Sequence, residues 1–179
     1  MKWKWLSKIT MRVRGQTTTK QLVNAGLIVG KGFSRRNDVF IDGSHAYMIT
    51  IGDNVTLSAG VVILGHDAST KRALGYTILA PVHIGDNVFI GRNAIILPGV
   101  NIGNNVIIGA GSVVKNDIPN GCVVAGNPAK VIRATEDFLE KHRKQLSDAP
   151  AFGKEYVGKI SKERQKELRD SIKTIGYIV

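Results

Sequence analysis

The chain has 179 residues, 43% hydrophobic and 22% charged, a composition that matches ordinary globular proteins and excludes a wholly disordered or fibrous chain. It carries 25 lysine and arginine residues against 14 aspartate and glutamate residues, for a formal net charge of +11. The only cysteine, Cys122, rules out an intrachain disulfide framework and a thiolate zinc site, and we expect it to be a small buried residue.

The excess of positive charge lies at the two ends of the chain. Residues 1–36 contain nine basic and no acidic side chains, residues 37–128 contain four basic and six acidic ones, and residues 129–179 contain twelve basic and eight acidic ones. No nucleic-acid-binding motif accompanies this charge, so we expect no nucleic-acid partner.

Residues 1–26 form a basic N-terminal arm. Trp3 and Trp5 stand among the lysines of residues 1–14, which indicates either peripheral contact with a membrane or an amphipathic element packed on the domain. The chain has neither the apolar core of a signal peptide nor an apolar run of membrane-spanning length, so we expect a cytoplasmic protein.

A period of six residues organises the middle of the chain. Two mainly aliphatic series of residues keep this step, and each member of the second series stands four residues after a member of the first. The first series is Ile78, Ile84, Ile90, Ile96, Ile102, Ile108 and Val114, and the second is Val82, Val88, Ala94, Val100, Val106, Ser112 and Ile118. Glycine often follows the first series, and Asp/Asn pairs come next, which suits tight corners because glycine and asparagine tolerate positive φ angles.

A six-residue period does not fit an α-helix, but it fits short strands that bend at corners. Three such strands close a coil of roughly eighteen residues, and successive coils stack at ~4.8 Å. We therefore expect a mainly β protein with a parallel β-solenoid over residues 27–133, built of roughly five coils. The same pattern appears upstream at Ile51, Leu57 and Ile63, and it breaks twice, so residues 42–50 and 64–77 are expected excursions from the regular path.

The pattern changes after Pro128. Residues 134–179 are expected to form a C-terminal helical extension, with one helix over about 135–147 and a second over about 161–174.

The hexapeptide register and the closing stretch GAGSVVKNDIPNGCVVAGNPAKVIR over residues 109–133 resemble the hexapeptide-repeat acyltransferases. Within that superfamily the chain is most similar to the maltose/galactoside O-acetyltransferase-like branch, which includes acetyltransferases of surface-polysaccharide synthesis. The resemblance implies a left-handed parallel β-helix, a homotrimer with active sites between subunits, acetyl-CoA as donor, a carbohydrate hydroxyl as acceptor and no metal requirement. Left-handedness rests on the resemblance alone, because parallel crossovers are generally right-handed.

Acetyl transfer to a sugar hydroxyl needs a base that works near neutral pH. His66 stands after Gly65 where the second excursion begins, and by resemblance it is the catalytic histidine. Asp42 in the first excursion corresponds to an acidic residue that holds the acceptor or orients the base, and His45 is the alternative for that role. On the acceptor side, the expected binding residues are Asn37, His45 and Asp67.

The resemblance also places the donor. Gly91 and Arg92 correspond to positions beside the thioester and the pantetheine arm, and Ala110 to another small residue on that arm. Positions near the far end of the cofactor are Lys115, Asn116, Lys130 and Arg133, and basic side chains among them suit its phosphates.

Three other functions remain open from the sequence. The first is N-acetylation of an amino sugar or nucleotide sugar, and the second is a non-catalytic solenoid scaffold. The third is a zinc carbonic anhydrase on the same solenoid, which needs three histidines, two of them closely spaced. No close pair exists in the sequence, and His83 is expected on the outer wall of the solenoid.

Overall fold

The computed structural model describes residues 17–179, so the expected membrane contact of residues 1–14, with Trp3 and Trp5, lies outside the described residues. The chain divides into two compact units, the first ending at Thr135 and the second running from Glu136 to Val179. Within residues 17–179, no helix combines the length and the apolar character needed to cross a bilayer.

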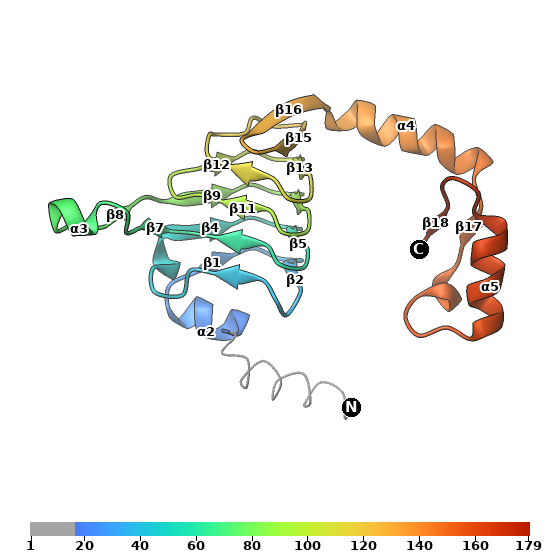
Figure 1. Cartoon of the computed structure of the whole chain (residues 1–179), viewed down its shortest axis with the longest axis horizontal. Helices are drawn as coiled ribbons and strands as arrows, with labels where there is room; N and C mark the ends of the chain where they lie inside the picture. Colours follow the sequence, from blue (N-terminus) through green and yellow to red (C-terminus); the bar gives the residue numbers. More distant parts are fainter. Residues whose placement is uncertain (1–16) are drawn as a thin grey trace. The chain divides into compact units, whose positions relative to one another are not determined.

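The first unit is a parallel β-solenoid with three sheets, drawn as stacked arrows in Figure 1. Sheet A contains β1 (Ile28–Val29), β4 (Ile49–Ile51), β9 (Val82–Ile84) and β12 (Asn101–Ile102). Sheet B contains β2 (Ser34–Arg35), β5 (Thr56–Leu57), β10 (Phe89–Ile90), β13 (Ile107–Ile108), β15 (Cys122–Gly126) and β16 (Ala129–Ala134). Sheet C contains β3 (Phe40–Ile41), β6 (Val62–Ile63), β11 (Ile95–Ile96) and β14 (Val113–Val114). The chain visits sheets A, B and C in turn, and a fifth coil begins with a bridge at Ile118 and continues into β15.

The stacking register shows where the coils are regular. Ile84 pairs with Ile102, and corner hydrogen bonds between these two coils join residues 18 apart, as the six-residue period predicts. The corresponding bonds one coil earlier join residues 33 apart, and those of the first two coils join residues 22 apart. The second and third coils are thus separated by a long insertion, and the first and second by a short one.

The two aliphatic series fill the interior almost as predicted. Ile84, Ile90, Ile96, Ile102, Ile108 and Val114 are buried, and so is the second series from Val82 to Ile118. Ser112 takes its place inside by donating its hydroxyl to the Gly109 carbonyl at 2.7 Å. Cys122 is buried, as expected, and His83 is exposed on the outer wall.

The prediction for Ile78 is wrong. Ile78 lies 45% exposed in β8 (Ile78–Leu79), which pairs antiparallel with β7 (His66–Asp67). The second excursion therefore continues past residue 77, and the regular path resumes only at Val82. The first excursion ends earlier than expected, because Ile49 is already buried in β4.

Asparagine and aspartate hold the corners between sheets A and B. Asn54, Asn87 and Asn105 adopt positive φ angles of 55–56°, and their side-chain amides form a ladder with spacings of 3.1 and 3.3 Å. Beside it, the Asp86 carboxylate accepts the backbone N–H of Asp53 at 2.7 Å, and one coil higher the Asn104 side-chain oxygen accepts the backbone N–H of Asp86 at the same distance. These bonds satisfy backbone donors that a corner would otherwise leave unpaired.

The first coil is covered by α2 (Thr19–Asn24), a segment that the sequence analysis assigned to the basic arm. Thr18 and Gln21 form a capping box, and Leu22 is fully buried in the hydrophobic core of the solenoid. The antiparallel pair of β15 and β16 completes the other end of sheet B.

The second unit contains the two predicted helices, α4 (Thr135–Asp148) and α5 (Lys162–Ser171). A short parallel pair, β17 (Ala151–Phe152) and β18 (Tyr177–Ile178), and a 3-10 turn, η2 (Lys154–Tyr156), accompany them. Ser161 caps α5 by accepting the backbone N–H of Arg164.

Candidate active site

Both excursions leave the solenoid at the same corner, where the chain passes from sheet C to sheet A. The first runs from β3 through η1 (Ala46–Met48) to β4, and the second runs from β6 through β7, α3 (Lys71–Leu74) and β8 to β9. Strand β3 pairs with β6 and strand β4 with β9, so the excursions lie on adjacent coils. In Figure 1 the second excursion projects from the side of the stack.

Asp42 sits at the base of the first excursion with its side chain only 2% exposed. Its backbone N–H donates to the Ile63 carbonyl at 2.9 Å, which ties it to the coil that carries the second excursion. One carboxylate oxygen accepts the hydroxyl of Ser44 at 2.6 Å and its backbone N–H at 3.2 Å. The other accepts the backbone N–H of Gly65 at 3.3 Å.

Gly65 permits this close contact between the excursions. A Cβ added there would lie 3.2 Å from the His45 carbonyl oxygen and 3.3 Å from the Met48 Cβ. Glycine at this position therefore lets the second excursion pack directly on the first.

His66, the residue after Gly65, is hydrogen-bonded through its Nδ1 to Asp42 Oδ2. A carboxylate only accepts hydrogen bonds, so Nδ1 carries the proton and Nε2 of the neutral ring presents a lone pair. The His66 side chain is 31% exposed. The geometry thus gives a buried carboxylate that orients a solvent-accessible imidazole, an arrangement suited to general-base chemistry.

Burial alone would raise the pKa of Asp42, but hydrogen bonds from Ser44 and His66, the charge of His66 and the Gly65 N–H together hold that pKa below its ordinary value. A lowered pKa keeps the carboxylate ionised in the folded protein, which is the state that orients His66.

The shift makes stability depend on pH in a predictable direction. Because the folded-state pKa of Asp42 lies below the unfolded value of about 3.9, its stabilisation is present above that pH and lost as the pH falls through the folded value. We expect Asp42→Asn to lower the free energy of unfolding at pH 7 by about 1.5–3 kcal/mol, as for a hydrogen bond to a charged group. Urea unfolding of both proteins from pH 7 to pH 3 should show this difference shrinking below roughly pH 4; a difference that stays constant would contradict the assignment.

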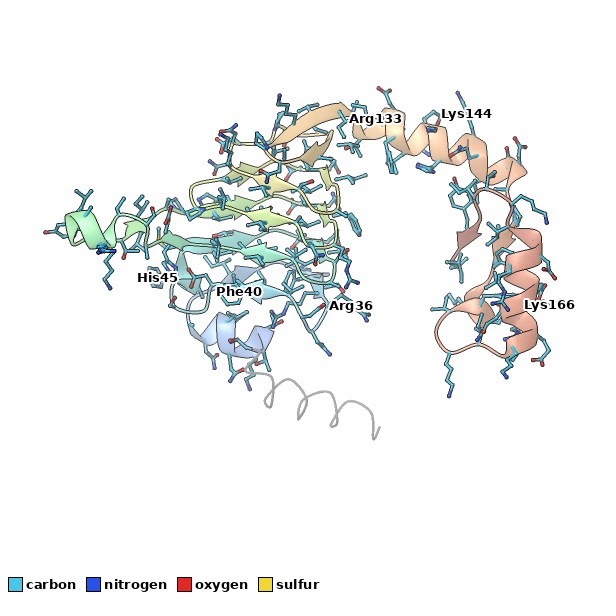
Figure 2. The ribbon with its side chains drawn as sticks, in the orientation of Figure 1. Arg36, Phe40, His45, Arg133, Lys144 and Lys166 are labelled. Carbon is cyan, nitrogen blue, oxygen red and sulfur yellow. The ribbon has the colours of Figure 1, made fainter. Side chains whose placement is uncertain are left out.

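His45 joins the cluster from the first excursion. Its ring centroid lies 4.6 Å from that of His66, and its Nδ1 lies 3.6 Å from Asp42 Oδ2. His45 and His66 are not closely spaced in the sequence, and they meet because the two excursions share a corner. Figure 2 shows His45 near the point where the second excursion leaves the solenoid. Asp42, His45 and His66 also form a group whose ligand atoms all lie within 4.8 Å of one another, so they could hold a metal ion.

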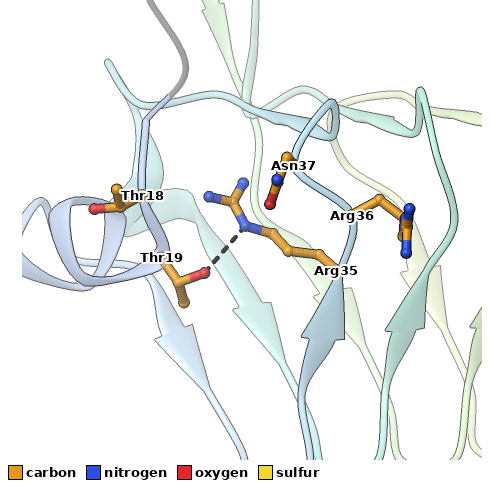
Figure 3. Close-up of a pocket in the computed structure, with 5 residues that line it drawn as sticks. All are labelled: Thr18, Thr19, Arg35, Arg36 and Asn37. Atoms are coloured by element: carbon orange, nitrogen blue, oxygen red, sulfur yellow. Dashed lines mark hydrogen bonds between the residues drawn. The ribbon is translucent and has the colours of Figure 1, made fainter. Parts of the chain in front are cut away.

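The other acceptor candidates make no hydrogen bond to Asp42, His45 or His66 among those that the structure gives for residues 17–179. Asp67 is exposed, and its carboxylate accepts the Ser69 backbone N–H at 2.8 Å, so it shapes the turn of the excursion. Asn37 lies at the next corner, between sheets B and C, beside a small pocket of about 110 Å³ lined by Thr18, Thr19, Arg35, Arg36 and Asn37. Figure 3 shows the Arg35 side chain reaching from its strand to Thr19, to which its Nε donates at 3.0 Å.

The donor candidates fall into two groups. Gly91, Arg92 and Ala110 lie at the corner between sheets B and C on adjacent coils, where the Gly91 N–H donates to the Ile108 carbonyl at 2.8 Å. A Cβ on Gly91 would lie 2.6 Å from the Ala110 nitrogen, so this corner is stacked tightly.

The basic candidates are further along the chain. Lys130 and Arg133 are exposed on β16, at the end of sheet B. Lys115 and Asn116 follow β14 at the corner between sheets C and A, on a later coil than His66. Within one chain, then, the expected base and the Gly91–Ala110 pair occupy different corners of the solenoid.

Sequence reasoning missed Ser44, which makes two of the hydrogen bonds to Asp42. The signal was present, because aspartate commonly accepts from the backbone two residues ahead in a turn, and Ser44 stands two residues after Asp42.

Comparison with known proteins places these features in context. Residues 81–116 match a family model described as bacterial transferase hexapeptide (six repeats), and residues 43–64 match one described as the hexapeptide repeat of succinyl-transferase.

Among curated relatives, protein CapG of Staphylococcus aureus is 47% identical over 103 residues, covering 55% of this chain and 60% of that protein. A 2,3,4,5-tetrahydropyridine-2,6-dicarboxylate N-acetyltransferase of Staphylococcus carnosus is 46% identical over 98 residues, covering 55% and 38%. Galactoside O-acetyltransferase of Escherichia coli is 46% identical over 99 residues, covering 54% and 48%. The match thus spans roughly half of this chain and between 38% and 60% of these relatives.

Solved structures give longer matches. A maltose O-acetyltransferase from Clostridium difficile 630 is 33% identical with a TM-score of 0.53, covering 74% of this chain and 86% of that one. A galactoside acetyltransferase solved in complex with coenzyme A is 37% identical with a TM-score of 0.50, covering 63% and 62%.

Proposed function

Because the chain belongs to the hexapeptide-repeat acyltransferase superfamily, we propose that it transfers the acetyl group of acetyl-CoA to a hydroxyl of a carbohydrate. The observation that carries the proposal is the Asp42–His66 pair, held at one corner by two excursions from an otherwise regular solenoid. The similarity to a galactoside acetyltransferase solved with coenzyme A supports the donor.

In this mechanism His66 Nε2 takes the proton of the acceptor hydroxyl as its oxygen attacks the thioester carbonyl. Asp42 keeps Nδ1 protonated and stabilises the imidazolium that forms. A backbone N–H donates to the oxygen of the tetrahedral intermediate. The candidate is an N–H at the Gly91 corner other than that of Gly91 itself, which is already bonded to the Ile108 carbonyl. The intermediate collapses when the carbon–sulfur bond breaks, and the coenzyme A thiolate receives the proton from His66. Acetyl ester and free coenzyme A are the products, and no metal takes part.

We further propose that the active enzyme is a homotrimer of left-handed β-helices with its sites between subunits. The separation of His66 from the Gly91–Ala110 corner within one chain supports this, because a neighbouring subunit can bring the second corner to the first. Large apolar side chains on the outer surface support it too: Phe40, Phe89 and, on the second excursion, Leu74 and Tyr76 are exposed. Sedimentation equilibrium measures the oligomeric state directly.

The experiment that tests the function is acceptor screening. The protein is incubated with acetyl-CoA and a panel of sugars, nucleotide sugars and oligosaccharides, and free coenzyme A is measured by its thiol. We expect acceptor-dependent release and an acetyl ester that mild alkali removes. Failure of every hydroxyl acceptor in the panel, with the donor bound, would contradict carbohydrate O-acetylation.

A second candidate is N-acetylation of an amino sugar or related amine, which the similarity to an N-acetyltransferase favours. The same screen separates the two, because an amide product survives alkali whereas an ester does not. A role in surface-polysaccharide synthesis would be supported if polysaccharide-derived acceptors gave the highest kcat/KM.

A further inference from the structure

One nitrogen in the candidate active site has no hydrogen-bond partner. His45 Nδ1 has an accessible area below 1 Å² yet makes no hydrogen bond. Its closest counter-charge is Asp42 Oδ2, at 3.6 Å, which is too long for a normal hydrogen bond. A buried polar atom left in this way is costly, and such an atom calls for an explanation in a native structure.

The surroundings of this nitrogen have the chemistry of a metal site. Asp42, His45 and His66 each offer one ligand atom, and the three atoms lie within 4.8 Å of one another. Two imidazole nitrogens and one carboxylate oxygen form a common donor set for Zn²⁺. Tetrahedral ligands at the usual bond lengths of about 2.0–2.1 Å lie roughly 3.4 Å apart, close to the 3.6 Å between His45 Nδ1 and Asp42 Oδ2. His66 Nδ1 and Asp42 Oδ2 are in hydrogen-bond contact, so these two atoms have to move apart when an ion replaces the proton between them.

The site has the further features that a bound cation needs. Hydrogen bonds from Ser44 to the second carboxylate oxygen fix Asp42, as partners outside the ligand shell do in metal sites. The side chains of His45 and His66 are 26% and 31% exposed, so an ion can enter from solvent and keep a water as fourth ligand.

We propose that Asp42, His45 and His66 form a Zn²⁺ site within each chain, and that the bound ion reversibly inhibits acetyl transfer. The inhibition rests on the function proposed above, whereas the binding does not. Zn²⁺ takes the place of the proton between His66 Nδ1 and Asp42 Oδ2, and the ring stays a neutral imidazole because a proton occupies Nε2 instead. Nε2 then has no lone pair with which to accept the proton of the acceptor hydroxyl.

The test measures metal binding before any activity. ZnCl₂ is titrated into the metal-free full-length protein in a calorimeter, and CoCl₂ absorption spectra report the ligand geometry. We expect one ion per chain, weaker binding as the pH falls because the ligands must lose protons, and a tetrahedral Co²⁺ spectrum. His45→Gln should weaken binding at least tenfold, and Ser44→Ala by roughly 10–100-fold.

His83→Gln is the matched control, because His83 is an exposed histidine on the wall of the same solenoid. It should bind Zn²⁺ with wild-type affinity. Circular dichroism of each variant shows whether the fold is retained. Absence of saturable binding at one ion per chain, or equal binding by His45→Gln and wild type, would overturn the site.

Acetyl transfer is then measured with and without Zn²⁺ and after adding a chelator. Inhibition that the chelator reverses, in wild type and in His83→Gln alike, supports the proposal. Binding without inhibition overturns the inhibitory role, and binding in a protein that transfers no acetyl group shows that the proposed function has failed while the metal site stands.

Discussion

Replacing His66 by alanine should slow acetyl transfer by roughly 10²–10⁴-fold, the range expected when a general base is removed. An alcohol attacks a thioester poorly unless its proton leaves as the bond forms. His66 is the imidazole that the structure holds both against a buried carboxylate and open to solvent. The substitution leaves Asp42 its bonds to Ser44 and Gly65, so the corner should keep its shape.

Release of coenzyme A is measured at saturating acceptor, which gives kcat, and at limiting acceptor, which gives kcat/KM. Acetyl-CoA binding, measured separately by calorimetry, should change little in His66→Ala, because the donor candidates Gly91 and Ala110 lie at another corner. His83→Ala serves as the histidine control and should retain full activity. If His66→Ala kept activity within about threefold of wild type, the base would have to be another group. If neither wild type nor variant transferred acetyl to any acceptor, a scaffold role would fit better.

The solenoid could be predicted from sequence because its rule is local. Each short strand and corner repeats the same requirements, an inward aliphatic and a residue that tolerates the bend, so the period alone specifies sheets A, B and C. Ile78 shows the limit of this reasoning. It keeps the six-residue step and the residue type, yet it pairs with Asp67 in the excursion rather than joining the column. Residue identity and spacing do not distinguish a strand of the wall from a strand outside it.

The site was predictable in part. His66 stands where the period breaks, the family resemblance pointed to both His66 and Asp42, and the structure brings the two into contact. The approach of His45 to the same carboxylate could not be found in this way. It depends on the direction of the His45 side chain just before η1 and on the stacking of the two excursions, which follows from the 22-residue offset between the first two coils. Asn37 and the donor candidates remain predictions, because their roles depend on the proposed trimer.

The column of aliphatic side chains should dominate the stability of the solenoid. Ile96 is fully buried between Ile63 and Val114 of the neighbouring coils, and we expect Ile96→Ala to lower the free energy of unfolding by about 2–5 kcal/mol. This cost combines the lost burial of the side chain with the cavity it leaves in a closely packed interior.

The adjacent residue provides the matched control. Ile95 belongs to the same strand but faces outward and is only half-buried, so Ile95→Ala should cost no more than about 1 kcal/mol. Urea unfolding followed by circular dichroism measures both variants. One fixed protein concentration is used, because the proposed association of subunits would add to the apparent stability. Both substitutions remove the same atoms from adjacent positions of the same strand. A large difference between their effects on the free energy of unfolding can therefore come only from the direction in which each side chain points. Equal losses in the free energy of unfolding would mean that burial of the interior column does not stabilise the solenoid, and the six-residue period would then lack its physical explanation.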